Sequence, residues 1–382
     1  MPPLRARAER FGAIVELESP PALVSIDRAL ARELGVDGGP LWEGESPGLD
    51  VEALSAPIEA HVAITERCPS GCSRCYAGAT PKGHEPELQS ILSRLDALAS
   101  QGTFRVAIGG GEPSLHPELG RIAAHARSLG LVPTVTTSGI GVTAETAPRY
   151  RAFAQVNVSY EGAGETYRDV RGYDGAAGAE SAMRALAGAG VPFGVNTVLT
   201  RASWPHVGET AARAEALGAR EIQLLRLKPS GRGRLDYLAS RLTPAQIAEV
   251  PARVRSLVEE RSLAVRIDCA LVPFLAPGIS DPQELGRLGV MGCEAGRSLV
   301  AIRAHGGGAP CSFWPGASVS AAGWDDDPTL ASLRAYGARP PEPCASCAAR
   351  ASCRSGCRIV AEHLTGDPFA PDPECPRVGR SP

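Results

Sequence analysis

Alternating strand and helix patterns between residues 56 and 268 constrain the fold more than any other feature of this sequence. Short apolar segments suited to strands alternate with segments whose apolar residues have helical spacing, although no helix is predicted between the strands at 131–139 and 152–162. Such alternation implies βαβ units and a parallel sheet. About six units predict an α/β fold, a partial (β/α)6 barrel of the TIM type. The expected strands are residues 58–65, 104–110, 131–139, 152–162, 191–200, 220–229 and 264–268.

Two different regions flank this barrel region. Residues 1–55 predict a small α+β segment, with two strand-like stretches, a short helix over 28–36 and a turn-rich linker. From 269 to 382 the regular pattern is lost and Cys, Gly and Pro become frequent, although 298–314 predicts a hairpin. This last region has little apolar material to bury, so we expect bound metal to supply part of its stability.

Overall charge and hydropathy exclude several classes of partner. The net charge is −3 and the pI is about 6.2, so no basic field favours nucleic acid or an anionic membrane. No apolar run reaches the roughly 18 residues of a membrane span, and residues 1–19 lack the apolar core of a signal peptide. We therefore expect a cytoplasmic protein with no membrane partner. In that compartment its 11 cysteines are expected to be metal ligands or catalytic thiols rather than disulfides.

The cysteines fall into two separate groups along the chain. Three lie within residues 68–75, none lies between 76 and 268, and the remainder lie in the last third. This distribution suits one three-ligand cluster and two four-ligand clusters. The C-terminal cysteines are Cys269, Cys293, Cys311, Cys344, Cys347, Cys353, Cys357 and Cys375.

The N-terminal group, Cys68, Cys72 and Cys75, has the spacing C-x3-C-x2-C with no fourth cysteine close by. A structural zinc site normally takes four ligands in two paired sets, so this spacing suits zinc poorly. Three thiolates can instead hold three irons of a 4Fe–4S cube and leave the fourth iron open to another ligand.

This loop, followed by the aromatic Tyr76, resembles the signature of the radical S-adenosylmethionine (radical SAM) enzymes. The resemblance implies that the open iron binds the amine and carboxylate of SAM. It further implies an enzyme that cleaves SAM reductively to methionine and a 5′-deoxyadenosyl radical, which abstracts hydrogen from a substrate C–H bond. A flavodoxin or a ferredoxin is the reductant expected by this resemblance.

Other strand ends resemble the segments of that family that contact SAM. One resembles the segment that receives the amino group, a second the ribose contact, and a third the Ser and Arg pair that binds the carboxylate. A glycine-rich strand end also marks ordinary turns, and the order behind the cysteine loop is what favours the SAM interpretation. The expected residues are, in that order, Gly110, Gly111, Glu112 and Pro113; Thr137 and Ser138; and Ser159 and Arg171.

The C-terminal cysteines resemble the seven-cysteine SPASM extension of radical SAM enzymes, which carries two auxiliary iron–sulfur clusters. Two C-x-x-C-like pairs also occur in zinc sites, and that alternative stays open. By the resemblance, Cys293, Cys311 and Cys357 hold auxiliary cluster I, and Cys344, Cys347, Cys353 and Cys375 hold auxiliary cluster II.

Two residues near these clusters are less settled. Cys269 lies outside the seven, and we expect it to complete auxiliary cluster I as the fourth ligand. The alternatives are a buried free thiol, or a cluster with an open iron for a substrate thiol. Ser312 stands directly after Cys311, where the anaerobic sulfatase-maturating branch has an aspartate base. A hydroxyl without a partner is a poor base, which argues against that branch.

These observations predict a radical SAM oxidoreductase whose substrate is most often, in resembling enzymes, a ribosomally made peptide. Such peptides are cross-linked, epimerised or oxidised, and residues 1–55 offer strands to which a leader peptide can add. The alternative within the family is oxidation of a small molecule or a tetrapyrrole side chain. The alternative of another class is a non-catalytic iron–sulfur or zinc protein, which would have no use for the residues from Gly110 to Arg171.

Overall fold

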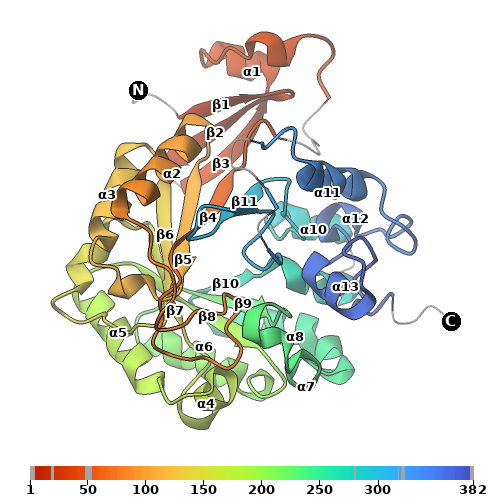
Figure 1. The fold of residues 1–382 in the computed structure, drawn as a ribbon. Coiled ribbons are helices and arrows are strands. Elements are labelled where there is room, and N and C mark those ends of the chain that lie inside the picture. The colour runs from red at the N-terminus through yellow and green to blue at the C-terminus, as the bar shows by residue number, and fades with distance from the viewer. Residues whose placement is uncertain are drawn as a thin grey trace.

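One large, mostly parallel sheet organises the molecule in the computed structural model (Figure 1). Its order is β10-β9-β8-β7-β6-β5-β4-β11-β12. The structure describes residues 5–18, 21–47, 54–278, 281–316, 318–319 and 323–378.

Seven consecutive strands pair in parallel with their neighbours in the chain. Because each strand lies beside the next one in sequence, the sheet winds in a single direction, as barrel strands do. The expected α/β partial barrel is confirmed. Its strands are β4 (Glu59–Thr65), β5 (Arg105–Gly110), β6 (Val132–Thr137), β7 (Gln155–Ser159), β8 (Phe193–Leu199), β9 (Glu221–Arg226) and β10 (Ala264–Ile267).

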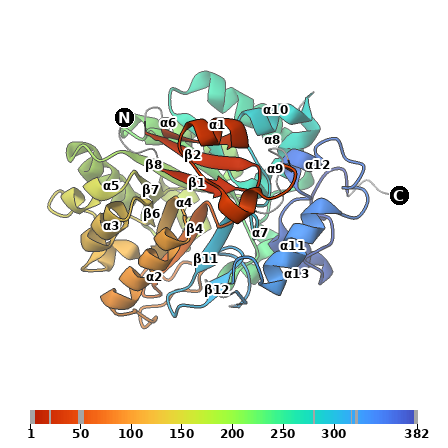
Figure 2. The same cartoon turned by 90° about the horizontal axis from the view of Figure 1, so that it is seen from above.

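Helices cover the outer face of this sheet (Figures 1 and 2). Some begin with sequence signals, as α8 does with the capping box of Thr243 and Gln246. Their apolar stripes bury residues such as Leu95 against the strands. The helices are α2 (Leu88–Ser100), α3 (Leu119–Ser128), α4 (Gly164–Arg171), α5 (Ala176–Gly188), α6 (Val207–Ala216), α7 (Tyr237–Ser240) and α8 (Pro244–Glu260).

The two faces of the barrel sheet differ in polarity. On β4, Ala60, Val62 and Ile64 are buried in the core shared with the helices. The alternate residues of a strand point to the opposite face, and there Glu59 and His61 have side chains that are 37% and 32% exposed. Parallel sheets are usually apolar on both faces. The inner face of this barrel is instead polar and reached by solvent.

The N-terminal region is a separate small sheet packed on the barrel. Strands β1 (Ala6–Glu9), β2 (Gly12–Glu18) and β3 (Pro21–Asp27) are antiparallel, with β2 in the middle, and helix α1 (Arg28–Glu33) follows. The sequence predicted two of these strands and the helix, but not β1. Arg7 donates to the carbonyls of Pro57 (2.9 Å) and Gly102 (3.0 Å). Both residues precede barrel strands, so this sheet lies at the N-terminal end of the barrel.

The C-terminal region returns to the barrel through the predicted hairpin. Strands β11 (Leu299–Ile302) and β12 (Gly308–Ala309) are antiparallel, which confirms the hairpin. The sequence did not predict that β11 would also pair in parallel with β4 and so extend the main sheet. The helices of this region are α9 (Val272–Leu275), α10 (Pro282–Arg287), α11 (Pro328–Ala338), α12 (Arg350–Cys353) and α13 (Arg358–Thr365).

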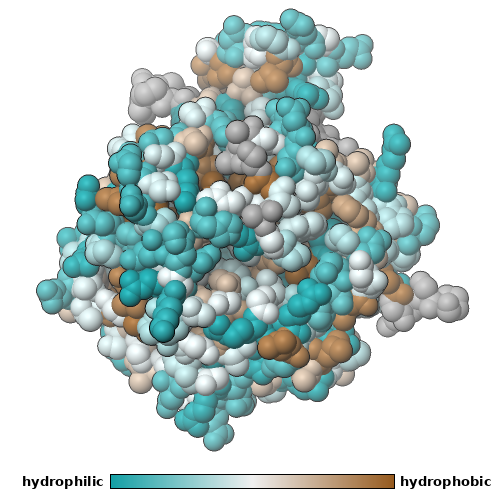
Figure 3. All heavy atoms as spheres, in the orientation of Figure 1, coloured by the Kyte–Doolittle hydropathy of each residue, from teal (hydrophilic) through white to brown (hydrophobic). Residues whose placement is uncertain are grey.

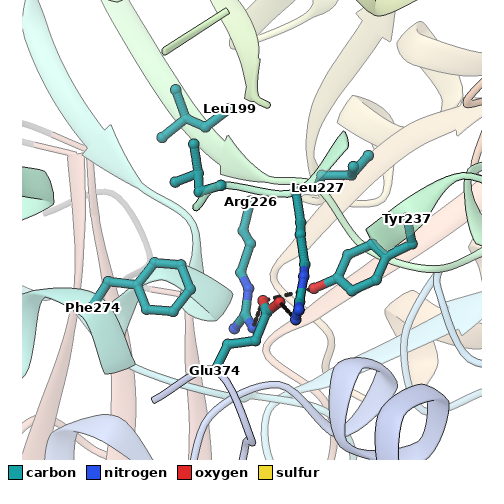
Figure 4. A pocket seen from close by; sticks show the side chains of 8 residues that line it. Leu199, Arg226, Leu227, Tyr237, Phe274 and Glu374 are labelled. Atoms are coloured by element: carbon teal, nitrogen blue, oxygen red, sulfur yellow. Dashed lines mark hydrogen bonds and ion pairs between the residues drawn. The ribbon is translucent and has the colours of Figure 1, made fainter. Parts of the chain in front are cut away.

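A buried ion network ties the end of the chain to the barrel (Figure 4). Arg226, at the end of β9, pairs with both oxygens of Asp372, at 2.6 and 3.1 Å, and with Glu374 at 2.6 Å. Its guanidinium also stacks over Phe274, 4.5 Å from the ring centroid. Tyr237 donates to Glu374 at 2.8 Å. All the charges of this network are shielded from water, so each depends on its partner.

Among the described residues, no helix has both the length and the apolar character to cross a bilayer. Hydrophilic side chains predominate on the face shown in Figure 3.

We predict that Arg226→Met destabilises the protein strongly. The variant leaves the Asp372 carboxylate buried without its cation, whereas Glu374 keeps its ion pair with Arg241. A buried carboxylate that loses its partner costs about 3–5 kcal/mol of the free energy of unfolding. Urea unfolding followed by tryptophan fluorescence measures the change. Arg184→Met is the control, because Arg184 is 56% exposed and its pair with Glu180 is worth little at the surface. Equal urea midpoints for the Arg226 variant and wild type would contradict the prediction.

Candidate functional site

The three N-terminal cysteines lie in an irregular segment, residues 66–87, between β4 and α2, at the C-terminal end of the barrel. The amide of Cys68 donates to Thr80 O at 2.9 Å, and that of Cys75 to Cys72 O at 3.3 Å. Burial raises the pKa of the Cys72 thiol, Arg171 opposes this, and the nearby thiols of Cys75 and Cys68 add to it. The structure therefore brings the three predicted cluster thiols into one another's electrostatic range.

Two glycines at the end of β5 hold this segment by close backbone contact. A Cβ on Gly110 would lie 2.2 Å from Thr65 O, and one on Gly111 would lie 2.2 Å from Arg67 O. Gly110 also has φ +118, which disfavours other residues. The Gly111 amide donates to Thr65 O at 2.7 Å, and the Glu112 amide donates to Arg67 O at 2.8 Å. These glycines position the cysteine segment, whatever else they contact.

The side chain of Glu112 is already engaged by the next strand end. It accepts from Thr137 Oγ1 at 2.6 Å and from the amide and hydroxyl of Ser138 at 2.8 and 2.5 Å. Glu112 is buried, and Pro113 follows it in a short 3-10 turn (Pro113–Leu115). Glu112, Thr137 and Ser138 thus form one connected set. Because the Glu112 oxygens are engaged, the groups left to contact a ligand there are hydroxyls and backbone carbonyls.

Arg171 lies against the cysteine segment, at the end of α4. Its guanidinium makes a fork with Glu161, Nε to Oε2 at 2.7 Å and Nη2 to Oε1 at 2.6 Å. Its carbonyl accepts from the Ser73 amide at 3.1 Å. Burial works to lower the pKa of Arg171, but Glu161 outweighs it and holds the pKa above the ordinary value. Ser159, the other member of the expected pair, is buried at the end of β7.

The segment after β9 completes the support of the cysteine loop. Arg232 donates from its side chain to Cys72 O at 2.8 Å and Ala79 O at 2.9 Å, and from its amide to Cys75 O at 2.9 Å. A Cβ at Gly231 would lie 2.4 Å from Cys75 O. Sequence reasoning missed Arg232 and Glu161, because neither belongs to a motif. Arg232 moreover acts on Cys72, which is 160 residues away in the chain.

Four C-terminal cysteines gather near the barrel: Cys269, Cys293, Cys311 and Cys357, which we call the proximal cysteine group. Burial raises the pKa of the Cys311 thiol to about 12, with Cys293 and Cys357 contributing. Burial and Asp268 raise the pKa of Cys269, again with Cys293 and Cys357 as neighbours. Cys269, the least settled of the predicted ligands, is therefore placed with the three cysteines expected for auxiliary cluster I.

The other four form the distal cysteine group: Cys344, Cys347, Cys353 and Cys375. Burial raises the pKa of the Cys353 thiol to about 12, and Cys375 and Cys344 add to it. The pKa of Cys344 is raised by burial, with a contribution from Cys347. Arg377 Nη1 donates to Cys347 Sγ at 3.1 Å. This partition is the one expected for auxiliary cluster II.

The spacing of these thiols differs from that of a site for a single metal ion. Within the described ranges, no three His, Cys, Asp or Glu side chains converge as the ligands of one ion would. In an iron–sulfur cluster each thiolate binds a different iron, so its ligands stand further apart than those of zinc. Soft thiolate donors in sets of three and four fit such clusters. Binding would displace the thiol protons that burial retains.

The N-terminal cysteine loop and the proximal cysteine group are in contact. Tyr76 and Phe313 pack with ring centroids 4.9 Å apart. Ser230 donates to Tyr76 O at 3.2 Å and to Phe313 O at 3.0 Å, and so bridges the two loops. Burial raises the pKa of Tyr76 to about 12, so its phenol stays neutral. The two loops that carry the expected metal ligands therefore pack against each other at the C-terminal end of the barrel.

Ser312 has a partner that the sequence did not reveal. Its hydroxyl lies 2.8 Å from Nδ1 of His61 on β4, and Nε2 of His61 lies 3.0 Å from Glu59 Oε1. Glu59 and His61 share the inner face of the sheet because they are two residues apart on one strand. This chain of groups can accept a proton from a molecule bound inside the barrel.

Unsatisfied polar atoms on the inner face are suited to a polar ligand. Among the described residues, Asn157 Oδ1 and Asn196 Oδ1 are buried without a hydrogen-bond partner. Asn157 and Asn196 are on the neighbouring strands β7 and β8, close to Ser159 in the strand register. Amide oxygens accept from ribose hydroxyls or an ammonium group. The donor set at this end of the barrel therefore fits SAM beside an iron–sulfur cluster.

Comparison with known proteins agrees with this chemistry. Residues 62–214 match the model of the radical SAM superfamily. The chain is 30% identical to the PqqA peptide cyclase of Methylocella silvestris over 338 residues, 84% of this chain and 87% of that protein. It is 28% identical to the pre-heme d1 synthase of Dinoroseobacter shibae over 347 residues, 82% and 84% of the two chains.

Among solved structures, SuiB of Streptococcus suis shares the fold. SuiB bound to S-adenosylmethionine has a TM-score of 0.76 at 16% identity, over 98% of this chain and 99% of its own. SuiB bound to the precursor peptide SuiA gives the same TM-score, over 98% of each chain. With a relative 30% identical across most of its length, this chain belongs to the radical SAM superfamily.

Proposed function

We propose that this protein uses SAM radical chemistry to modify a ribosomally made peptide. The observation that carries the proposal is the loop of Cys68, Cys72 and Cys75, three thiols at the C-terminal end of a barrel with no fourth cysteine close by in the sequence. Membership of the radical SAM superfamily brings SAM and a 4Fe–4S cluster with it. When bound, these two groups supply a 5′-deoxyadenosyl radical for abstracting hydrogen from a substrate C–H bond.

The residues around the loop would bind and orient SAM. Arg171, kept charged by Glu161, offers its remaining guanidinium nitrogen to the SAM carboxylate, and Ser159 lies at the adjacent strand end. The carbonyls next to Gly110 and Gly111 accept from the SAM ammonium, and Glu112 holds Thr137 and Ser138 in place for the ribose. With SAM held by these residues, a substrate would have to approach its reacting carbon closely, and positioning that approach would be the task of the barrel.

The C-terminal region, residues 269–382, would carry two further iron–sulfur clusters. The proximal cysteine group would hold auxiliary cluster I with Cys269 as its fourth ligand, and the distal cysteine group would hold auxiliary cluster II. The electrostatic grouping of the thiols supports this division. A flavodoxin or a ferredoxin is the proposed electron donor.

A peptide substrate is favoured by the small N-terminal sheet. Because β2 lies in the middle, β1 and β3 are its edges, and an extended peptide can add to such an edge as a further strand. Apolar side chains are exposed nearby, Val24 at 37% and Leu30 at 43%. This sheet is at the opposite end of the barrel from the cysteine loop. β4 runs from that end of the barrel to the cysteine loop and has 7 residues. The segment between a leader bound to the small sheet and the modified residue must therefore span at least about seven extended residues.

A small molecule such as a tetrapyrrole remains the second candidate, since the pre-heme d1 synthase named above is nearly as similar as the peptide cyclase. Co-expression separates the two. Short peptides encoded next to the gene are co-expressed with wild type and analysed by mass spectrometry. A mass change in one peptide that depends on Cys68, Cys72 and Cys75 supports the proposal. SAM cleavage with no change in any such peptide favours the small molecule.

We predict that Cys68→Ala, Cys72→Ala and Cys75→Ala together abolish SAM cleavage. Anaerobic wild type should hold about 12 irons per chain if all three sites are 4Fe–4S cubes, and the triple variant about eight. Dithionite and SAM should release 5′-deoxyadenosine from wild type alone, measured by chromatography. Equal release from the triple variant would show that this loop does not hold the reactive cluster.

We predict that Arg171→Lys weakens SAM binding roughly tenfold, about 1.4 kcal/mol. A lysine cannot reproduce the fork to Glu161 together with a contact to the SAM carboxylate. Equilibrium dialysis with labelled SAM measures the dissociation constant, and iron analysis checks that the cluster is retained. Arg168→Lys is the matched control on the exposed side of the same helix. Unchanged affinity in the Arg171 variant would remove Arg171 from the SAM site.

A further inference from the structure

Lys228 is an unusual residue in this chain. The protein has 39 lysines and arginines, and only Lys82 and Lys228 are lysines. Lys82 is exposed, whereas Lys228 lies two residues beyond β9 and is 6% exposed. An ammonium is compact and carries one charge at a point, while a guanidinium is a wide planar fork. Of the two lysines in a chain otherwise so rich in arginine, Lys228 is therefore the buried one.

The ammonium of Lys228 contacts two residues that are close in sequence to members of the proximal cysteine group. It pairs with the carboxylate of Asp268, the residue before Cys269. It also lies 4.3 Å from the ring centroid of Phe313, two residues after Cys311. Asp268 Oδ1 is 3.4 Å from Cys269 Sγ.

The same packing unit contains other members of this group. Leu227, which precedes Lys228, is buried with Ala270 and Cys357, and Cys311 and Phe313 pack against them. The Lys228–Asp268 pair therefore stands inside the ligand set rather than at its margin.

Both charges of the pair stand close to the thiols. Burial works to lower the pKa of Lys228, but Asp268 and the neighbouring thiols outweigh it, so the ammonium keeps its charge. One oxygen of Asp268 pairs with this ammonium, and the other lies 3.4 Å from Cys269 Sγ. The pair is thus a buried positive and negative charge side by side among the proximal cysteines.

We propose that the Lys228–Asp268 pair sets the reduction potential of the iron–sulfur centre held by the proximal cysteine group. This inference rests on the proposed function, which places a cluster there. One-electron reduction, by dithionite or by a reductant protein, adds one negative charge to this buried centre. Lys228 stabilises the reduced form and Asp268 destabilises it, since charges act strongly where water is excluded.

The test uses the full-length, anaerobically reconstituted protein in which Cys68, Cys72 and Cys75 are alanine, so that only the auxiliary centres titrate. Redox titration with dithionite, followed by electron paramagnetic resonance, gives their midpoint potentials. Lys228→Met should lower one of the two potentials, and Asp268→Asn should raise the same one. A packing defect would shift the midpoint potential in the same direction in both variants. Opposite shifts therefore indicate an effect of charge.

Two further variants serve as controls. Lys228→Arg keeps the charge and should restore most of the wild-type potential, and Lys82→Met, the same change at the exposed lysine, should leave both potentials unchanged. If Lys228→Met does not fold, the rise expected for Asp268→Asn decides the matter.

Iron content separates two kinds of failure. About eight irons with unmoved potentials, or shifts of the same sign in both charge variants, overturn the inference alone. About four irons or fewer in this background would overturn the proposed auxiliary centres and the inference with them.

Discussion

The cysteine loop between β4 and α2 has no regular structure of its own, and its three thiols must still face one cluster. The surrounding barrel meets this constraint through backbone contacts from several strand ends. The amides of Gly111 and Glu112 hold the start of the loop, the carbonyl of Arg171 holds its middle, and Arg232 holds Cys72 and Cys75 by their carbonyls. The parallel barrel matters to the chemistry because it brings these distant segments to one rim.

The polarity of the barrel explains how a substrate can be reached from inside. The apolar residues of the strands pack against the helices outside. The inner face instead carries polar groups such as His61 and Asn157. The C-terminal region closes on this face from one side, through β11 beside β4 and the buried network of Arg226 and Asp372. The two cysteine-bearing loops then meet at Tyr76 and Phe313.

Much of the fold could be predicted from the sequence, because apolar periodicity reports local structure well. The parallel strands, the longer helices between them and the hairpin all followed from it. The short helices α4 and α7, strand β1 and the pairing of β11 with β4 did not. β1 is short and mixed in character, and the partner of a strand depends on contacts far away in sequence. The three-region division at 55 and 268 stays a prediction, and β11 crosses it by joining the barrel sheet.

The sequence by itself determined the donor atoms of the site: three thiols in one loop, eight more in the last third, and the strand ends that accompany them. Ligand spacing within a short segment is a local property, and a chain carries it before it folds. Only the tertiary structure decided which distant groups act on those atoms. Glu161 holds Arg171, His61 meets Ser312, and Lys228 with Asp268 stands among the proximal cysteines. Apart from Glu161 and Arg171, which are 10 residues apart, these partners are distant in the chain, and none of the pairs follows a spacing rule. Burial brings them together, since a charge or a hydroxyl removed from water must find its partner wherever the fold provides one.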